Sequence, residues 1–158
     1  MSHDKEIDRR TFCLQACQAA SCLALGSLIQ ACGGAGGGGS APSNVPLLSS
    51  VNGNVSGNTV TLQIASASPL AAVGGAAILF SSGGSFLVSR TAQDAFTVVT
   101  ATCTHEACTI TGFENANYVC PCHGSRFTPD GRVVMGPATA PLRTFAAQFS
   151  NNVLTITV

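Results

Sequence analysis

The chain has 158 residues, a length that suits one domain with additional segments. Charged residues make up 9% of the chain and the formal net charge is zero, which argues against nucleic acid as a partner. The eight cysteines fall into two groups, four in the first 32 residues and four between positions 103 and 122.

Residues 1–32 are predicted to be an export signal. The run "RRTF" at 9–12 resembles the twin-arginine signal, and the apolar, uncharged stretch 12–31 is typical of the middle of a signal peptide. Ala31 before Cys32 resembles the cleavage box of bacterial lipoproteins, which makes Cys32 the expected lipidated N-terminus. The alternative is an uncleaved transmembrane anchor, which the polar side chains within 12–31 disfavour.

A glycine-rich stretch, 33–46, follows and is predicted to be a flexible linker. Residues 47–158 are then the folded domain. Its sequence has no helical periodicity but many short β-branched and aromatic runs separated by turn residues. Strands are predicted at 59–65, 76–82, 85–90, 95–103, 118–120, 131–136, 142–150 and 153–158. "GG" at 83–84 and "NN" at 151–152 are expected hairpin turns. The predicted fold is all-β and antiparallel.

Metal ligands are predicted from two short motifs. "CTH" offers Cys103 and His105, and "CPCH" offers Cys120 and His123. Each motif leaves a predicted strand and turns, so that its two side chains can converge. Every histidine and cysteine beyond position 32 lies between 103 and 123, and this concentration is the strongest functional signal in the sequence.

Cys120 and Cys122 flank Pro121, and only one of the two is expected to reach a metal. Cys108 is the remaining cysteine and is available to the other. A Cys108–Cys122 disulfide would tie the two motif loops together and contribute roughly 3 kcal/mol in the chain-entropy model. Such a bond requires an oxidising compartment, which export would supply.

Two cysteines and two histidines suit either tetrahedral zinc or a Rieske [2Fe-2S] centre. Each motif here donates one residue of each type, whereas the histidines of a zinc finger usually come from one helix. "CTHEAC … CPCHGS" resembles the Rieske iron–sulfur family, especially the high-potential subunits of cytochrome bc-type complexes. The resemblance implies an antiparallel β-sandwich carrying a small subdomain of two cluster-binding loops.

The same resemblance assigns roles to individual residues. Cys103 and Cys120 would bind the inner iron, and His105 and His123 the outer iron, of one [2Fe-2S] cluster. A structural zinc-binding module remains the alternative.

The resemblance also implies a surrounding shell. The Ser125 hydroxyl would donate a hydrogen bond to a bridging sulfide, and Gly124 would let the backbone approach the cluster. "MGPATAPL", which contains Pro137, resembles the loop that covers the cluster. Phe127 departs from the family, because high-potential members often carry there a tyrosine that donates to a cysteine sulfur.

The implied function is one-electron transfer on the periplasmic face of a bacterial membrane, in a quinol-oxidising chain. Expected partners are a cytochrome b-type subunit or quinol oxidase, a cytochrome c acceptor, and the membrane through the N-terminal anchor. The chain would be a component of an oxidoreductase rather than an independent catalyst. The alternative is the small subunit of a periplasmic molybdenum oxidase resembling arsenite oxidase. A ferredoxin of a ring-hydroxylating oxygenase is disfavoured, because such ferredoxins typically lack Cys108 and Cys122.

Overall fold

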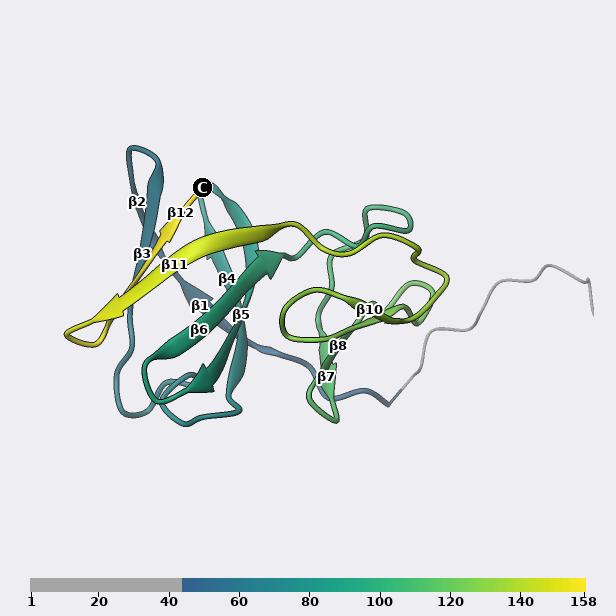
Figure 1. Ribbon diagram of the computed structural model, residues 1–158, viewed down its shortest axis with the longest axis horizontal. Coiled ribbons are helices and arrows are strands. Elements are labelled where there is room, and N and C mark those ends of the chain that lie inside the picture. Colours follow the sequence, from purple (N-terminus) through teal and green to yellow (C-terminus); the bar gives the residue numbers. More distant parts are fainter. Residues whose placement is uncertain (1–43) are drawn as a thin grey trace, which may run out of the picture. The chain divides into compact units, whose positions relative to one another are not determined.

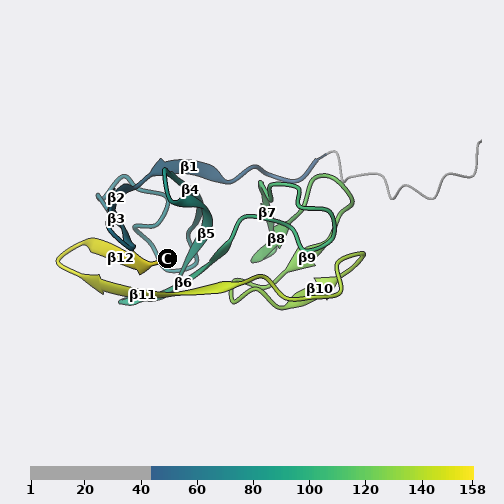
Figure 2. The same cartoon turned by 90° about the horizontal axis from the view of Figure 1, so that it is seen from above.

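The computed structural model describes residues 44–158, which form twelve strands and no helix, so the all-β prediction is confirmed. Eight strands make a large sheet and four make a small one (Figures 1 and 2). No segment of this described part is a helix capable of crossing a membrane. The predictions for residues 1–32, Cys32 included, fall outside the described residues, as does most of the predicted linker.

The large sheet is built from the two ends of the described chain. Its neighbour order is β1 (Ser49–Asn52), β4 (Ala76–Ser81), β5 (Gly84–Ala92), β6 (Ala95–Thr100), β11 (Thr144–Ser150), β12 (Val153–Thr157), β3 (Thr59–Gln63) and β2 (Asn54–Ser56). The first and last strands of this order, β1 and β2, are consecutive pieces of one extended segment. The segment therefore connects both ends of the sheet, which folds back on itself around its core (Figure 2).

Gly53 separates β1 from β2, and the packing there leaves no room for a side chain. A Cβ at this position would lie 2.7 Å from Val60 Cγ1 and 3.2 Å from the Thr61 carbonyl oxygen. β1 runs parallel to β4, so the prediction of a purely antiparallel sheet was wrong for this pair. The chain between them passes through β2, β3 and a long loop and returns in the original direction, which is what a parallel pair requires.

Two predicted hairpins are confirmed. Asn151 and Asn152 join β11 to β12 with φ values of 51° and 61°, the left-handed conformation that a two-residue hairpin turn favours. Gly84 closes the β4–β5 hairpin with φ 130° and pairs with Ser81. In β12 and β3 the apolar side chains alternate and are buried on one side, as the sequence pattern predicts.

The small sheet is an insertion between two neighbouring strands of the large one. β6 and β11 pair with each other, yet residues 101–143 lie between them in the sequence. Within this insertion the strand order is β10 (Val133–Met135), β9 (Arg126–Phe127), β8 (Asn117–Val119) and β7 (Gly112–Glu114). Both predicted ligand motifs belong to it, so the large sheet supplies the support and the insertion supplies the candidate site.

The chain before β1 runs along the small sheet. Leu47 forms a bridge with Gly112, and the Phe113 N–H donates to the Pro46 carbonyl at 2.9 Å. A Cβ on Gly112 would lie 2.8 Å from Val45 Cγ1. Val45 and Pro46, at the end of the predicted linker, therefore pack against the insertion.

Candidate metal centre

The first ligand loop, residues 103–108, is a tight turn closed by its own backbone. The Cys103 N–H donates to the Cys108 carbonyl at 2.8 Å, and the Ala107 N–H donates back to the Cys103 carbonyl at 3.0 Å. Ala107 has φ 53°, a conformation that reverses the chain. Two residues separate this loop from the end of β6, Ala95–Thr100, so the strand positions Cys103 at the start of the loop.

The second ligand loop, residues 120–125, repeats the same backbone pattern. The Cys120 N–H donates to the Ser125 carbonyl at 2.9 Å, and the Gly124 N–H donates back to the Cys120 carbonyl at 3.0 Å. Gly124 has φ 76°, at the place where the first loop has Ala107. Glycine adopts this positive φ without the steric cost that the side chain of Ala107 incurs, which is a conformational role in addition to the predicted close approach to the cluster.

The two predicted cysteine ligands occupy the buried first position of each loop. Cys103 is 2% exposed and Cys120 is 1% exposed, and neither is in a disulfide. Burial raises the pKa of the Cys120 thiol, and the neighbouring Cys103 thiol raises this pKa further, whereas a hydrogen bond from the Cys122 backbone lowers it. Two buried thiols side by side would repel each other as free thiolates, and a bound cation would relieve that repulsion.

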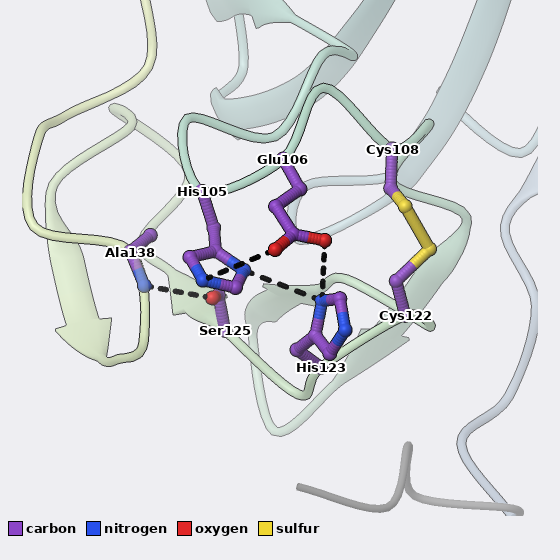
Figure 3. A network of polar contacts seen from close by, with 7 residues as sticks. All are labelled: His105, Glu106, Cys108, Cys122, His123, Ser125 and Ala138. Atoms are coloured by element: carbon purple, nitrogen blue, oxygen red, sulfur yellow. Dashed lines mark hydrogen bonds and ion pairs between the residues drawn. A yellow bond between two sulfur atoms is a disulfide. The ribbon is translucent and has the colours of Figure 1, made fainter. Parts of the chain in front are cut away.

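Cys108 and Cys122 form a disulfide that joins the two loops, with Cα atoms 6.5 Å apart (Figure 3). This is the pairing that the sequence predicted. The Cys120 sulfur also lies within 4.8 Å of both disulfide sulfurs. These three sulfurs do not form a ligand set, because a disulfide has no free thiolate to offer a metal.

The two predicted histidine ligands lie next to each other at the surface. Their Nδ1 atoms are 3.3 Å apart, and the rings meet edge to face with centroids 4.9 Å apart. The side chains of His105 and His123 are 28% and 31% exposed. The centre thus has two buried sulfur donors and two imidazoles open to solvent.

Glu106 lies beside both imidazoles and was not among the predicted site residues. Its carboxylate is 4.0 Å from His105 Nε2 and 3.8 Å from His123 Nδ1 (Figure 3). The side chain is 62% exposed. A single glutamate between a histidine and an alanine belongs to no ligand motif, so only its adjacency to His105 in the sequence could have pointed to it.

A third loop, 136–142, is attached to both ligand loops. The Ala138 N–H donates to Ser125 Oγ at 3.0 Å, and the Thr104 hydroxyl donates to the Ala140 carbonyl at 2.6 Å. Pro137 lies in this loop after a cis peptide bond. Ser125 is fully buried, and because its oxygen accepts from Ala138, its own proton is free to be donated to another acceptor.

Phe127 is part of the apolar packing around the two cysteines. It is fully buried in the same apolar cluster as Cys103 and Cys120 and pairs across strands with Tyr118. The Tyr118 hydroxyl is directed elsewhere, to Ser89 of the large sheet. Tyr118, the one tyrosine of the chain, is therefore already hydrogen-bonded, and Phe127 offers no donor.

The donor set fits a Rieske [2Fe-2S] cluster. Such a cluster needs two thiolates on one iron and two imidazoles on the other. The structure has one cysteine and one histidine on each of two equivalent loops, and a disulfide withdraws the other two cysteines from competition. The buried thiols and the exposed imidazoles also give the site an inner and an outer side.

Known proteins resemble parts of this chain. The family model for the Rieske [2Fe-2S] domain matches residues 63–146. The cytochrome b6-f complex iron-sulfur subunit of Chlorobaculum tepidum is 33% identical over 63 residues, which are 39% of this chain and 35% of that protein. The cytochrome b6-f complex iron-sulfur subunit 3 of Nostoc sp. is 52% identical over 42 residues, which are 26% of this chain and 24% of that protein.

Solved structures include a similar protein, the cyanobacterial plasma membrane Rieske protein from Synechocystis PCC 6803. It is 32% identical, with a TM-score of 0.48, over 53% of this chain and 87% of that one. The curated relatives named above are matched over about a third of their length or less.

Proposed function

Because the chain belongs to the Rieske [2Fe-2S] family, we propose that it transfers single electrons through one such cluster held by Cys103, His105, Cys120 and His123. When bound, the cluster supplies a one-electron acceptor, and two imidazoles in place of two thiolates make it easier to reduce. The observation that carries the ligand assignment is the difference in exposure between the buried cysteines and the partly exposed histidines.

Different residues of the chain bind the cluster, shield it from water and hold the two loops together. Cys103 and Cys120 bind from the buried side, where the apolar cluster around Phe127 excludes water. His105 and His123 bind from the solvent side and leave part of each ring accessible to a partner. The Cys108–Cys122 disulfide keeps the two loops at a fixed separation.

We further propose that the chain works on the periplasmic face of a bacterial membrane, in a quinol-oxidising chain. The support is the twin-arginine-like run at 9–12, the lipoprotein-like Cys32 and the resemblance to cytochrome b6-f subunits. An exposed histidine would hydrogen-bond a quinol and take its proton. The donor would be a quinol bound at a cytochrome b-type subunit, and the acceptor a cytochrome c.

Metal analysis tests the cluster. Protein purified without air after native expression should contain about two irons and two acid-labile sulfides per chain. Stoichiometric zinc with no iron would refute the assignment. A variant lacking only the disulfide, C108S/C122S, is the control, because it should still assemble iron.

Membrane attachment is tested separately through Cys32. If acylation holds the chain at the membrane, Cys32→Ala should release the protein into the soluble fraction. Cys13→Ala is the matched control, because this cysteine lies in the predicted signal and should not affect anchoring. Unchanged attachment of Cys32→Ala would favour an uncleaved helix at 12–31. Co-purification from native membranes then identifies the partner subunit.

A further inference from the structure

Glu106 places a carboxylate against the outer side of the candidate centre. Its two oxygens lie at 4.0 Å and 3.8 Å from ring nitrogens of His105 and His123, so one side chain faces both imidazoles (Figure 3). The side chain extends from the first ligand loop itself, which the disulfide and the backbone bonds hold in place. The carboxylate therefore lies close to both histidines, on a loop whose backbone is held in place.

No arginine or lysine neutralises this carboxylate within residues 44–158. That part of the chain contains four arginines, four carboxylates and no lysine. Two carboxylates have an arginine partner: Glu114 bonds Arg126 at 2.9 Å, and Asp130 bonds Arg132 at 3.0 Å.

The other two arginines are engaged elsewhere. Arg90 is buried and donates to backbone carbonyls of Leu70, Ala71 and Gln93, and Arg143 lies over the Phe145 ring. Among the described residues the only basic groups within 4.0 Å of the Glu106 carboxylate are the two histidines. Within residues 44–158, its field therefore acts on the centre without a compensating arginine or lysine.

We propose that Glu106 sets the reduction potential of this centre, lowering it relative to the same site with a neutral residue. Reduction adds one negative charge to the cluster, and a nearby fixed negative charge opposes it. The effect is moderated by water, because the side chain is 62% exposed. This inference rests on the proposed function, since it requires the cluster to be held by His105 and His123.

The test is the reduction potential of Glu106→Gln, measured by protein-film voltammetry. Glutamine keeps the shape of the side chain and removes its charge. We expect the equilibrium constant for reduction to rise roughly two- to fivefold, which is about 20–40 mV for a one-electron couple at 59 mV per tenfold change. Glu106→Lys should shift the potential further in the same direction. Raising the salt concentration should shrink the difference between wild type and Glu106→Gln, because exposed charges are screened.

Asp94→Asn is the matched control. Asp94 lies in the turn between β5 and β6, has no arginine or lysine partner among the described salt bridges, and its loss changes the net charge by the same amount. The reduction potential of the Asp94→Asn variant should equal that of the wild type. A potential unchanged in both Glu106→Gln and Glu106→Lys would overturn the proposal, provided that their electron-paramagnetic spectra show a full cluster. An equal shift in Asp94→Asn would also overturn it, because net charge rather than position would then be responsible.

The outcomes separate this inference from the proposed function. If wild-type protein binds no [2Fe-2S] cluster, the proposed function fails and no potential can be measured. If the wild type and all three variants carry a full cluster but share one potential, the proposed function stands and the role of Glu106 is refuted.

Discussion

The Tyr118 phenol and the Ser89 hydroxyl lie 2.5 Å apart and join the small sheet to the large one. Both residues are buried, Tyr118 on β8 and Ser89 on β5, and 29 positions separate them in the sequence. Tyr118 lies on the strand that leads directly into the second ligand loop. It connects the insertion that carries the candidate centre to the sheet that supports it.

Removing one partner of this bond should destabilise the fold. Tyr118→Phe leaves the buried Ser89 hydroxyl without a partner, which costs about 1–3 kcal/mol of unfolding free energy. Ser89→Ala should have a similar effect. The double variant should lose less than the sum of the single losses, because neither group is then left unpaired. Chemical denaturation of the four proteins measures this, and strictly additive losses would show that the two hydroxyls are not coupled.

Alkaline pH should destabilise the protein through the same tyrosine. Burial raises the pKa of the Tyr118 phenol above its ordinary value of 10.0, and the Ser89 hydrogen bond opposes this more weakly. In the unfolded chain the phenol ionises at its ordinary pKa, whereas in the folded chain it stays neutral to higher pH. The stabilising contribution is therefore complete below about pH 10 and is lost as pH rises beyond it.

Tyr118 is the only tyrosine of the chain, so Tyr118→Phe isolates its contribution. From about pH 9 to pH 11, the unfolding free energy of the wild type should fall more steeply than that of the variant. Denaturant titrations at each pH provide the comparison. Parallel curves for the two proteins would contradict the assigned direction of the pKa shift.

Hydrogen bonds near the cluster should tune its potential in predictable directions. Phe127→Tyr adds a hydroxyl beside the cysteines, which would stabilise the more negative, reduced state and raise the potential by several tens of millivolts. Ser125→Ala removes the hydroxyl whose proton is free to be donated, and should lower the potential by a similar amount.

Voltammetry of Phe127→Tyr and Ser125→Ala measures these shifts. Ser125→Thr is the control for Ser125→Ala, because it retains the hydroxyl. If Phe127→Tyr has the wild-type potential while its ring keeps its place, the hydrogen-bond argument at position 127 is wrong. Another feature, such as the solvent exposure of the histidines, would then set the reduction potential.

Loss of the disulfide should loosen the two ligand loops. The bond closes a loop with a sequence separation of 14, and removing it should lower the unfolding free energy by roughly 3 kcal/mol in the chain-entropy model. C108S/C122S should therefore unfold at lower denaturant concentration and release iron faster on warming. Iron release as slow as in the wild type would show that the other contacts suffice to hold the loops.

The sequence predicted the long strands and the family well, because both have local signatures. β12 and β11 alternate and meet at Asn151–Asn152, a turn that the residue types demand. The resemblance to the Rieske family, carried by the two Cys/His motifs, is confirmed by the family match. The Cys108–Cys122 disulfide, inferred by pairing the remaining cysteines, is present in the structure.

Other features depend on contacts between distant residues and have no local signature. β2 and β7 contain three residues each and β9 contains two, which is too few for a period to be recognised. The parallel pairing of β1 with β4 follows from the path of the chain rather than from either strand's composition. The position of Glu106 against both histidines depends on how the two loops meet, so the motif spacing did not indicate it.

In the proposed centre, one iron of a [2Fe-2S] cluster is bound by His105 and His123. Pulsed electron-paramagnetic resonance of the reduced protein, labelled with ¹⁵N-histidine, tests it most directly. His3 is the only other histidine of the chain, so His3→Ala leaves these two as the only labelled groups. We expect couplings from two ligand nitrogens, and loss of the cluster in His105→Ala and His123→Ala. A reduced cluster with no strongly coupled histidine nitrogen would contradict it, as would a full signal in either histidine variant.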